Sequence, residues 1–284
     1  MTVSGLGRLN ITFSQAFTSE PTTVTITKDR SGRYFVTMCL DEVKTAMPQT
    51  GLEVGVDLGI SRLATLSNGE HVPNARHTVR GQAKLAKLQR VLARRVKGSH
   101  RRALVKRKVA RHHAHIASAR KDTMDKLTTD LVRRFDVIAI EDLNVRGMVK
   151  NHCLAKHISC AGFGMFQKML AYKAGWYGKE VRMAGRFFPS SKRCSGCGFV
   201  HATMPLDVRE FSCEQCGTRH DRDENAAKNI LKFAEVTLQT TAGQAGSDGR
   251  GENVSPKIAS VVRGSSRRSV NQLSAENVEH VPLS

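Results

Sequence analysis

The clearest alternation of apolar and polar positions lies in residues 51–70, which read GLEVGVDLGISRLATLSNGE. From Leu52 to Val56 apolar residues alternate with small or polar ones, and the run ends at a carboxylate, Asp57. A second apolar run follows a glycine, and Asn68-Gly69 then offers a tight turn. This pattern predicts a strand that ends in an acid, a turn and a second strand of a hairpin.

A second strand that ends in acid is predicted at residues 136–142, DVIAIED. Its continuous apolar run, Val137 to Ile140, is typical of a strand that is buried on both faces. The run ends at Glu141 and Asp142. Because adjacent strand residues point to opposite faces, at most one of these two acids can share a site with Asp57.

Two β-rich runs in residues 22–43 flank Asp29-Arg30-Ser31-Gly32, which predicts an antiparallel hairpin. We expect residues Gly7 to Phe13 to join this piece. Such a small sheet is too small to be stable alone.

Helical spacing dominates the middle of the chain. Apolar residues recur at that spacing from Leu85 to Val96 and again from Val105 to Leu131, and Lys97-Gly98-Ser99-His100 interrupts them. This predicts a helical hairpin at 78–134. Aromatic and apolar residues in 151–178 then predict a helix that packs on the sheet, and 181–188 predict a further strand.

Charge changes the interpretation of that helical hairpin. The chain carries a formal charge of +20, which indicates a polyanionic partner, most simply nucleic acid, with a membrane surface as the weaker alternative. Between residues 76 and 120 there is no Asp or Glu, so this face would repel itself unless phosphates neutralise it. A solvated charged face is the plain alternative. The predicted nucleic-acid contacts are Arg80, Lys84, Lys87, Arg90, Arg94, Arg95, Arg101, Arg102, Lys106, Arg107 and Arg111.

Four of the seven cysteines form two Cys-x-x-Cys pairs, Cys194/Cys197 and Cys213/Cys216, with 15 residues between the pairs. This spacing predicts one structural, tetrahedral zinc ion. Two disulfides or four free thiols are the alternatives.

After the second pair, a helix is predicted with Ala227 and Ile230 on its buried face. Asp221 suits the N-cap, with Glu224 completing a capping box. Asp223 has the phase of the buried face, so it can turn inward, although both aspartates could simply stabilise the helix start. The sequence from 237 to 284 is rich in Gly, Ser, Thr, Gln and Asn and predicts a disordered tail.

Three acids are therefore predicted to meet: Asp57, Glu141 and Asp223. Carboxylates that lie close together need cations, and hard oxygen ligands select Mg²⁺ or Mn²⁺. Two such ions about 3.5–4 Å apart support phosphodiester hydrolysis. The hypothesis from the residues is a nuclease.

The residues that carry this chemistry also carry a family resemblance. The chain resembles the TnpB/OrfB proteins of bacterial insertion sequences, which are relatives of the type V CRISPR effectors, in VGVDLG at 54–59, IAIEDLN at 138–144, AYKAGWYGKEV at 171–181, FPSSKRCSGCG at 188–198 and CGTRHDRDENAAKNI at 216–230. The resemblance implies an RNase H-like (RuvC-type) α/β fold with a mixed sheet, interrupted by a helical insertion and a zinc ribbon. It also implies Mg²⁺-dependent DNA cleavage directed by a guide RNA.

Residue by residue, Asp57 matches the family's first acid, Glu141 its glutamate and Asp223 its third acid, while the four cysteines match its ribbon. Members of the family usually have a longer N-terminal part, so we expect this chain to be an N-terminally truncated member. Its first residues resemble the last strands of the family's wedge barrel.

The predicted organisation has five parts: a β-hairpin remnant at 1–50, a RuvC-like domain at 51–190 with the basic insertion, a zinc ribbon at 191–219, a RuvC-like helix at 220–236 and the tail. The leading hypothesis is an RNA-guided DNA endonuclease associated with transposition. The alternatives are a nuclease-incompetent DNA- or RNA-binding regulator with the same fold and, last, a zinc-ribbon transcription factor. No apolar run is long enough to span a membrane and no signal peptide is evident, so we expect a bacterial or archaeal cytoplasmic protein.

Overall fold

The computed structural model describes residues 2–3, 7–14, 16–42, 44–205, 207–243 and 278–279. The described residues divide into two compact units. The first takes its residues from 1–44, 81–115 and 255–284, and the second takes them from 45–80 and 116–254.

The second unit is built on a five-stranded mixed sheet with the order β7-β6-β5-β8-β9. Strands β5, β6 and β7 are antiparallel neighbours, whereas β8 and β9 run parallel to β5. Three antiparallel strands followed by two parallel ones is the mixed α/β arrangement of an RNase H-like sheet, as predicted. The bounds of the strands are β5 Glu53–Leu58, β6 Arg62–Leu66, β7 His71–Pro73, β8 Val137–Glu141 and β9 Glu180–Ala184.

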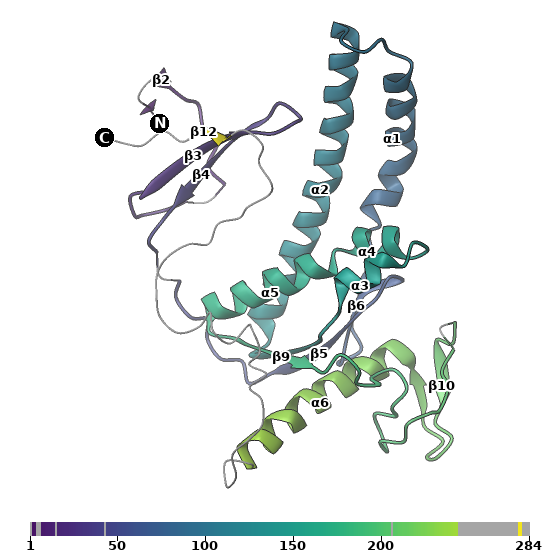
Figure 1. Ribbon diagram of the computed structural model, residues 1–284. Coiled ribbons are helices and arrows are strands. Elements are labelled where there is room, and N and C mark those ends of the chain that lie inside the picture. Colours follow the sequence, from purple (N-terminus) through teal and green to yellow (C-terminus); the bar gives the residue numbers. More distant parts are fainter. Residues whose placement is uncertain are drawn as a thin grey trace, which may run out of the picture. The chain divides into compact units, whose positions relative to one another are not determined.

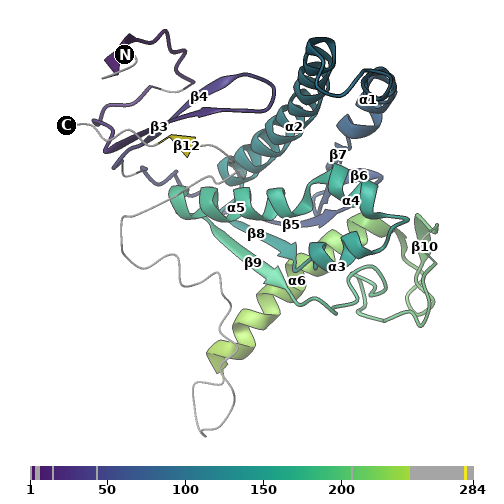
Figure 2. The same ribbon diagram turned by 45° about the horizontal axis from the view of Figure 1, so that its top comes forward.

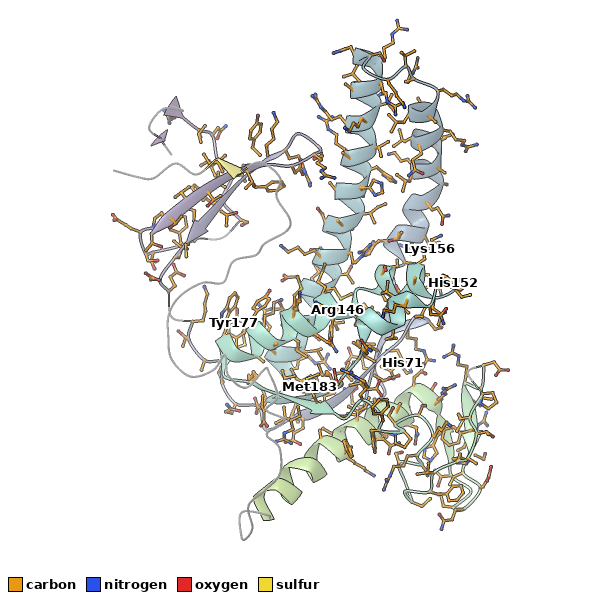
Figure 3. The ribbon with its side chains drawn as sticks, in the orientation of Figure 1. His71, Arg146, His152, Lys156, Tyr177 and Met183 are labelled. Carbon is orange, nitrogen blue, oxygen red and sulfur yellow. The ribbon has the colours of Figure 1, made fainter. Side chains whose placement is uncertain are left out.

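The tight turn between β6 and β7 forms as predicted. Gly69 lies there at φ +89°, and its N–H donates to the Leu66 carbonyl at 3.0 Å. Figure 3 labels two side chains at the edges of this sheet, His71 on β7 and Met183 on β9.

Helices cover both faces of this sheet, with α5 on one side and α6 on the other (Figures 1 and 2). One face carries the main core, in which Val54 and Ile138 pack with apolar residues of α2 and α5. The other face carries Ala139 and Ala184, which pack against Ile230 of α6. Since side chains alternate along a strand, odd-numbered residues of β5 and β8 face α6.

The helices of the second unit match the predictions only in part, since α3 was not predicted. They are α3 Val145–Lys150, α4 Ala155–Ala161, α5 Phe163–Tyr177 and α6 Arg222–Gly243, together with residues 116–134 of α2, which spans His100–Arg134. The single helix expected in 151–178 is in fact two helices, because Gly162 adopts a left-handed conformation between α4 and α5.

Two predicted boundaries were wrong. Strand β9 ends at Ala184 instead of 188, since the chain turns there and the Phe188 N–H donates to the Gly185 carbonyl at 3.0 Å. Helix α6 continues to Gly243, seven residues into the predicted tail. The rest of that predicted tail, apart from the short strand β12 (Val278–Glu279), lies outside the described residues.

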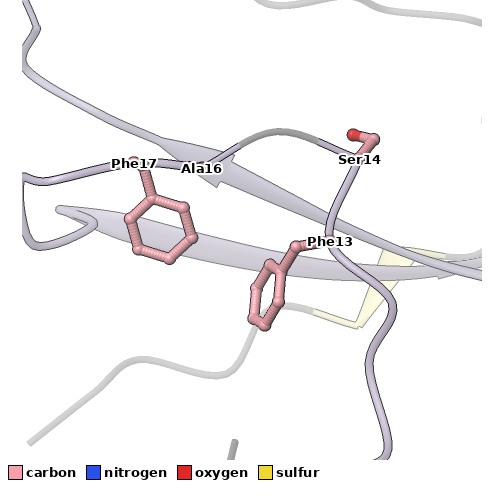
Figure 4. A pocket seen from close by; sticks show the side chains of 4 residues that line it. All are labelled: Phe13, Ser14, Ala16 and Phe17. Atoms are coloured by element: carbon pink, nitrogen blue, oxygen red, sulfur yellow. The ribbon is translucent and has the colours of Figure 1, made fainter.

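The first unit contains the predicted hairpin, β3 (Thr23–Lys28) and β4 (Tyr34–Cys39). Residues 7–13 do not join it, contrary to our prediction. Gly7–Arg8 form a short strand, β2, that pairs with β1 (Thr2–Val3), and β3 pairs with β12 instead. The unit also has an open hollow lined by Phe13, Ser14, Ala16 and Phe17 (Figure 4). None of these side chains is titratable, so the hollow offers no acid for phosphodiester chemistry.

The helical hairpin predicted at 78–134 consists of α1 (His77–Ala93) and the whole of α2. The chain turns at Gly98, which has φ +82°. A contact between the His112 imidazole and the Gly81 carbonyl, at 2.8 Å, joins the two helices. No side chain of α1 is buried, whereas the later part of α2 buries Met124, Leu127 and Leu131 in the main core. The predicted hairpin is therefore a surface element only over α1 and the start of α2.

Candidate metal and nucleic-acid sites

Asp57 and Glu141 lie at the same level of the sheet. In the parallel pairing of β5 with β8, Val56 is the partner of Ile140, so the next residue on each strand is an acid. Both acids are odd-numbered and lie on the face that α6 covers. The sequence predicted that these strands end in acid, and their parallel register brings the two acids together.

The electrostatics of Asp57 reflect this position. Burial, together with the negative charges of Glu141 and Asp223 and against the opposing charge of Arg222, raises the pKa of Asp57 to about 8. A carboxylate with such a high pKa is stabilised in its charged form when a cation binds beside it.

The start of α6 supplies the other two acids of this region. Asp221 caps the helix, because its Oδ1 accepts hydrogen bonds from the N–H groups of Asp223 (2.9 Å) and Glu224 (3.0 Å). The predicted N-cap role of Asp221 is therefore supported. Glu224 does not complete the predicted capping box. Its carboxylate instead accepts a hydrogen bond from the Lys228 ammonium at 2.7 Å.

Asp223 is held by two arginines that sequence reasoning missed. Arg62 of β6 lies 3.0 Å from Asp221 and 4.0 Å from Asp223, and Arg209 lies 3.7 Å from Asp223. No sequence signal marks either arginine. Asp223 contributes to the pKa of Asp57, but the three carboxylates do not form a compact ligand set. In the part of the chain that the structure describes, the four cysteines are the only group of three or more His, Cys, Asp or Glu whose ligand atoms all lie within 4.8 Å.

The four cysteines do form such a set. The Cys194 and Cys216 sulfurs are 3.8 Å apart, and those of Cys197 and Cys213 are 3.6 Å apart. Sulfurs bound to one tetrahedral zinc at about 2.3 Å lie about 3.8 Å from each other, so the four thiols fit a zinc ion. The distances also exceed any disulfide, which removes that alternative for these residues.

Neighbouring groups shift the pKa values of two thiols in this cluster in opposite directions. Against a backbone hydrogen bond with Phe199, burial and hydrogen bonds with the other three cysteines raise the pKa of Cys197 to about 12. A hydrogen bond with the Thr218 hydroxyl, at 3.3 Å, helps to lower the pKa of Cys216 to about 6. His220 Nε2 lies 3.2 Å from the Cys194 sulfur. Strands β10 (Glu210–Ser212) and β11 (Arg219–Asp221) pair antiparallel and fix the second cysteine pair between them.

A polar network joins this ribbon to the acids, and sequence reasoning missed it. The Ser190 hydroxyl lies 2.5 Å from Glu141 Oε1. The buried Asn229 of α6 donates its amide to the Ser190 carbonyl at 2.8 Å, and Asn225 holds the Arg193 carbonyl at 2.7 Å. The helical spacing of apolar residues predicted the buried face of α6. Two isolated asparagines produce no such repeating pattern, so their burial was not predictable from the sequence. The network positions Glu141 relative to α6.

The predicted nucleic-acid contacts are mostly exposed on the helical hairpin. Ten of the eleven side chains are exposed. Arg102 is the exception, because its guanidinium donates to the carbonyls of Leu92 (2.7 Å) and Arg95 (2.9 Å) and thus caps α1. Arg102 therefore has a structural role in the hairpin. Of the ten exposed side chains, Arg90 and Arg111 also donate to backbone carbonyls, those of Ala86 (3.4 Å) and Ser31 (3.3 Å).

Two family models match the chain. One, described as a probable transposase of the OrfB type, matches residues 35–152, and the other, described as a Cas12f1-like TNB domain, matches residues 163–230. The chain is 49% identical over 213 residues to a protein of Streptomyces pristinaespiralis whose name is "Putative RNA-guided DNA endonuclease", an overlap that covers 75% of this chain and 53% of that protein. It is 32% identical over 248 residues to the similarly named InsQ of Escherichia coli K12, covering 82% of this chain and 61% of InsQ.

The chain belongs to the TnpB/OrfB family. It spans between about half and three fifths of the length of these two relatives. Among solved structures, a Cas12f1–sgRNA–target DNA complex matches with a TM-score of 0.47 and 16% identity, covering 73% of this chain and 55% of that one. A separate question is whether a helix could cross a membrane. Among the described helices of this TnpB/OrfB chain, none has the length and apolar content needed to cross a bilayer.

Proposed function

We propose that the chain is a TnpB-like, RNA-guided DNA endonuclease that hydrolyses phosphodiester bonds at Asp57, Glu141 and Asp223. The observation that carries the proposal is the in-register pair Asp57/Glu141 on the face of the sheet where α6 begins. The names of the relatives agree with it.

Within this proposal the oxygen-only acids fit Mg²⁺ or Mn²⁺, and two bound ions would activate a water and stabilise the leaving 3′ oxygen. The residues of the chain then have distinct tasks. Asp57, Glu141 and Asp223 supply the oxygen ligands, and Ser190 orients Glu141 through its hydroxyl. Arg62 and Arg209 offset the charge of Asp223.

The remaining parts support this site. We propose that residues 191–219 form a ribbon around one structural zinc, and that the exposed cations of residues 78–134 bind the phosphates of the guide RNA or the DNA. We further propose the functional division given by the sequence, with 1–50 as a wedge remnant, 51–190 as a RuvC-like domain and 220–236 as its last helix. Since the proposed substrate is cellular DNA, the expected place of action is the bacterial or archaeal cytoplasm.

The test incubates purified protein, loaded with RNA from its host element, with DNA and Mg²⁺. Cleavage by the wild type is expected to be lost in Asp57→Ala and in Glu141→Gln. Asp122→Asn is the matched control, because Asp122 is an exposed acid of α2 that pairs with Lys126 at 2.7 Å. It should retain cleavage.

A nuclease-incompetent binding protein is the second candidate, and the spread of the three carboxylates favours it. Tight, salt-sensitive binding of RNA or DNA, with no cleavage by the wild type in Mg²⁺ or Mn²⁺, would establish that alternative and refute the nuclease.

A further inference from the structure

The loop that connects β9 to the zinc ribbon, residues 185–190, is rigidly built. Within it the Phe188 N–H donates to the Gly185 carbonyl at 3.0 Å, and the Ser190 N–H donates to the Phe188 carbonyl at 2.8 Å. The Phe188 ring stacks on Phe233 of α6, with centroids 4.1 Å apart and an interplanar angle of 18°. These contacts fix the backbone on both sides of Phe187.

Two polar contacts attach the same loop to the acidic end of β8. Arg186 Nη2 lies 2.7 Å from Asp142 Oδ2, and the Ser190 hydroxyl lies 2.5 Å from Glu141 Oε1. Phe187 lies between these two attachment points in the chain. Phe187 is three residues before Ser190, so its Cα lies within about 11 Å of the Cα of the residue whose hydroxyl contacts Glu141.

The Phe187 ring itself is 94% exposed, more than any other large apolar side chain among the described residues. A phenylalanine gains free energy from burial, so a planar ligand that stacks on this exposed ring would bind favourably there. Of the neighbouring cations, Arg186 pairs with Asp142 and Lys192 donates to the Ala202 carbonyl, whereas Arg193 is exposed and can attract an anionic ligand.

We propose that Phe187 is a positioning residue that stacks on a nucleobase of single-stranded DNA next to the acid site. This proposal rests on the proposed function and deepens it. An aromatic ring offers stacking that every base can accept, and it carries no hydrogen-bonding group that would select one base. In a duplex the base faces are already stacked, so the ring recognises an unpaired strand. Stacking holds that strand in place beside Asp57 and Glu141.

The experiment measures binding without hydrolysis. Fluorescein-labelled oligo(dT) and a labelled DNA duplex are titrated with the complete zinc-loaded chain in buffer without Mg²⁺ or Mn²⁺, and anisotropy is recorded. Phe187→Ala and Phe187→Leu are expected to weaken oligo(dT) binding roughly ten-fold, because base stacking is lost, and to leave duplex binding unchanged. Phe187→Trp should retain the affinity. The control is Phe35→Ala, which removes an exposed ring from β4.

Two further readouts separate stacking from a general effect. In a Trp176→Phe background, the emission of Phe187→Trp should be quenched by oligo(dT). An abasic oligonucleotide should bind wild type and Phe187→Ala equally. Unchanged oligo(dT) affinity of Phe187→Ala would overturn the proposal. Equal losses on oligo(dT) and duplex would also overturn it, and a protein partner for the ring would then be the better explanation.

The outcomes are independent of the nuclease proposal. A chain that stacks a base but never cleaves DNA refutes only the proposed function. A chain that cleaves DNA, depends on Asp57 and ignores the Phe187 substitutions refutes only the stacking.

Discussion

Gly55 controls how closely α6 approaches the sheet, and its substitution by alanine tests that role. Gly55 is an odd-numbered residue of β5 and faces α6. A Cβ atom at this position would lie 2.0 Å from the Ala227 carbonyl oxygen and 2.9 Å from Leu231 Cβ. The first of these contacts is with helix backbone, which cannot rotate away as a side chain can.

The expected cost follows from these distances. Ordinary contact begins at 3.4 Å, so α6 must move away from β5 by about 3.4 − 2.0 = 1.4 Å. Overpacking of this kind costs about 1–3 kcal/mol or more. Asp223 lies four residues before Ala227 on the same helix, so the displacement also carries Asp223 away from Asp57.

The assay is urea unfolding of Gly55→Ala followed by calorimetric titration with Mn²⁺. We expect a lower free energy of unfolding and a weaker Mn²⁺ affinity. Gly175→Ala is the matched control, because Gly175 lies inside α5 and a Cβ atom added there would meet nothing within 4 Å. That substitution should stabilise the protein by about 0.5–1 kcal/mol and leave Mn²⁺ binding unchanged. If Gly55→Ala unfolds like the wild type and binds Mn²⁺ equally well, close packing of α6 does not set the acid site.

Three other predictions follow from the two proposed metal sites and the hairpin. In metal-free buffer at pH 7, Asp57→Asn should raise the free energy of unfolding by more than about 1 kcal/mol, since a pKa unit corresponds to about 1.4 kcal/mol. The pKa of Asp57 is raised to about 8, so the folded state binds more protons than the unfolded state and loses stability as the pH rises from about 4 to about 8. The advantage of the variant should therefore vanish below pH 4, and an equal difference at pH 3 and pH 7 would contradict the linkage. Elemental analysis should find one zinc per chain in the wild type and none in Cys194→Ser. Cys153→Ser, which changes an exposed cysteine outside the cluster, is the control and should retain the zinc. Absence of zinc from the wild type would contradict the ribbon. Arg101→Ala should reduce the slope of log affinity against log salt concentration for nucleic-acid binding by about one. Arg102→Ala should instead destabilise the hairpin, because Arg102 caps α1. If the affinity of the wild type does not depend on salt, the hairpin does not bind phosphates.

Local sequence patterns were sufficient to predict most of the helices and strands of this protein. The alternation around Val56, the continuous run at Val137 and the helical spacing of residues 78–134 gave the right elements, because burial of an apolar face imposes its period on the sequence. The cysteine spacing gave the ribbon, since four ligands of one ion need two tight turns at fixed intervals. Several predicted element ends were wrong, because the period of apolar residues does not encode where an element stops. The boundaries in the structure lie at Gly162, Ala184 and Gly243.

The sequence by itself determined that acids end two buried strands and begin a helix, and that a positively charged hairpin and four cysteines with zinc-ligand spacing accompany them. Only the tertiary structure decided that Asp57 and Glu141 lie in register, because a parallel pairing joins residues 84 positions apart. It alone also decided that Arg62 approaches Asp223, that Ser190 meets Glu141, and that Phe187 stays exposed between two anchored neighbours. Such contacts depend on how separate elements pack, and a linear pattern carries no record of that packing.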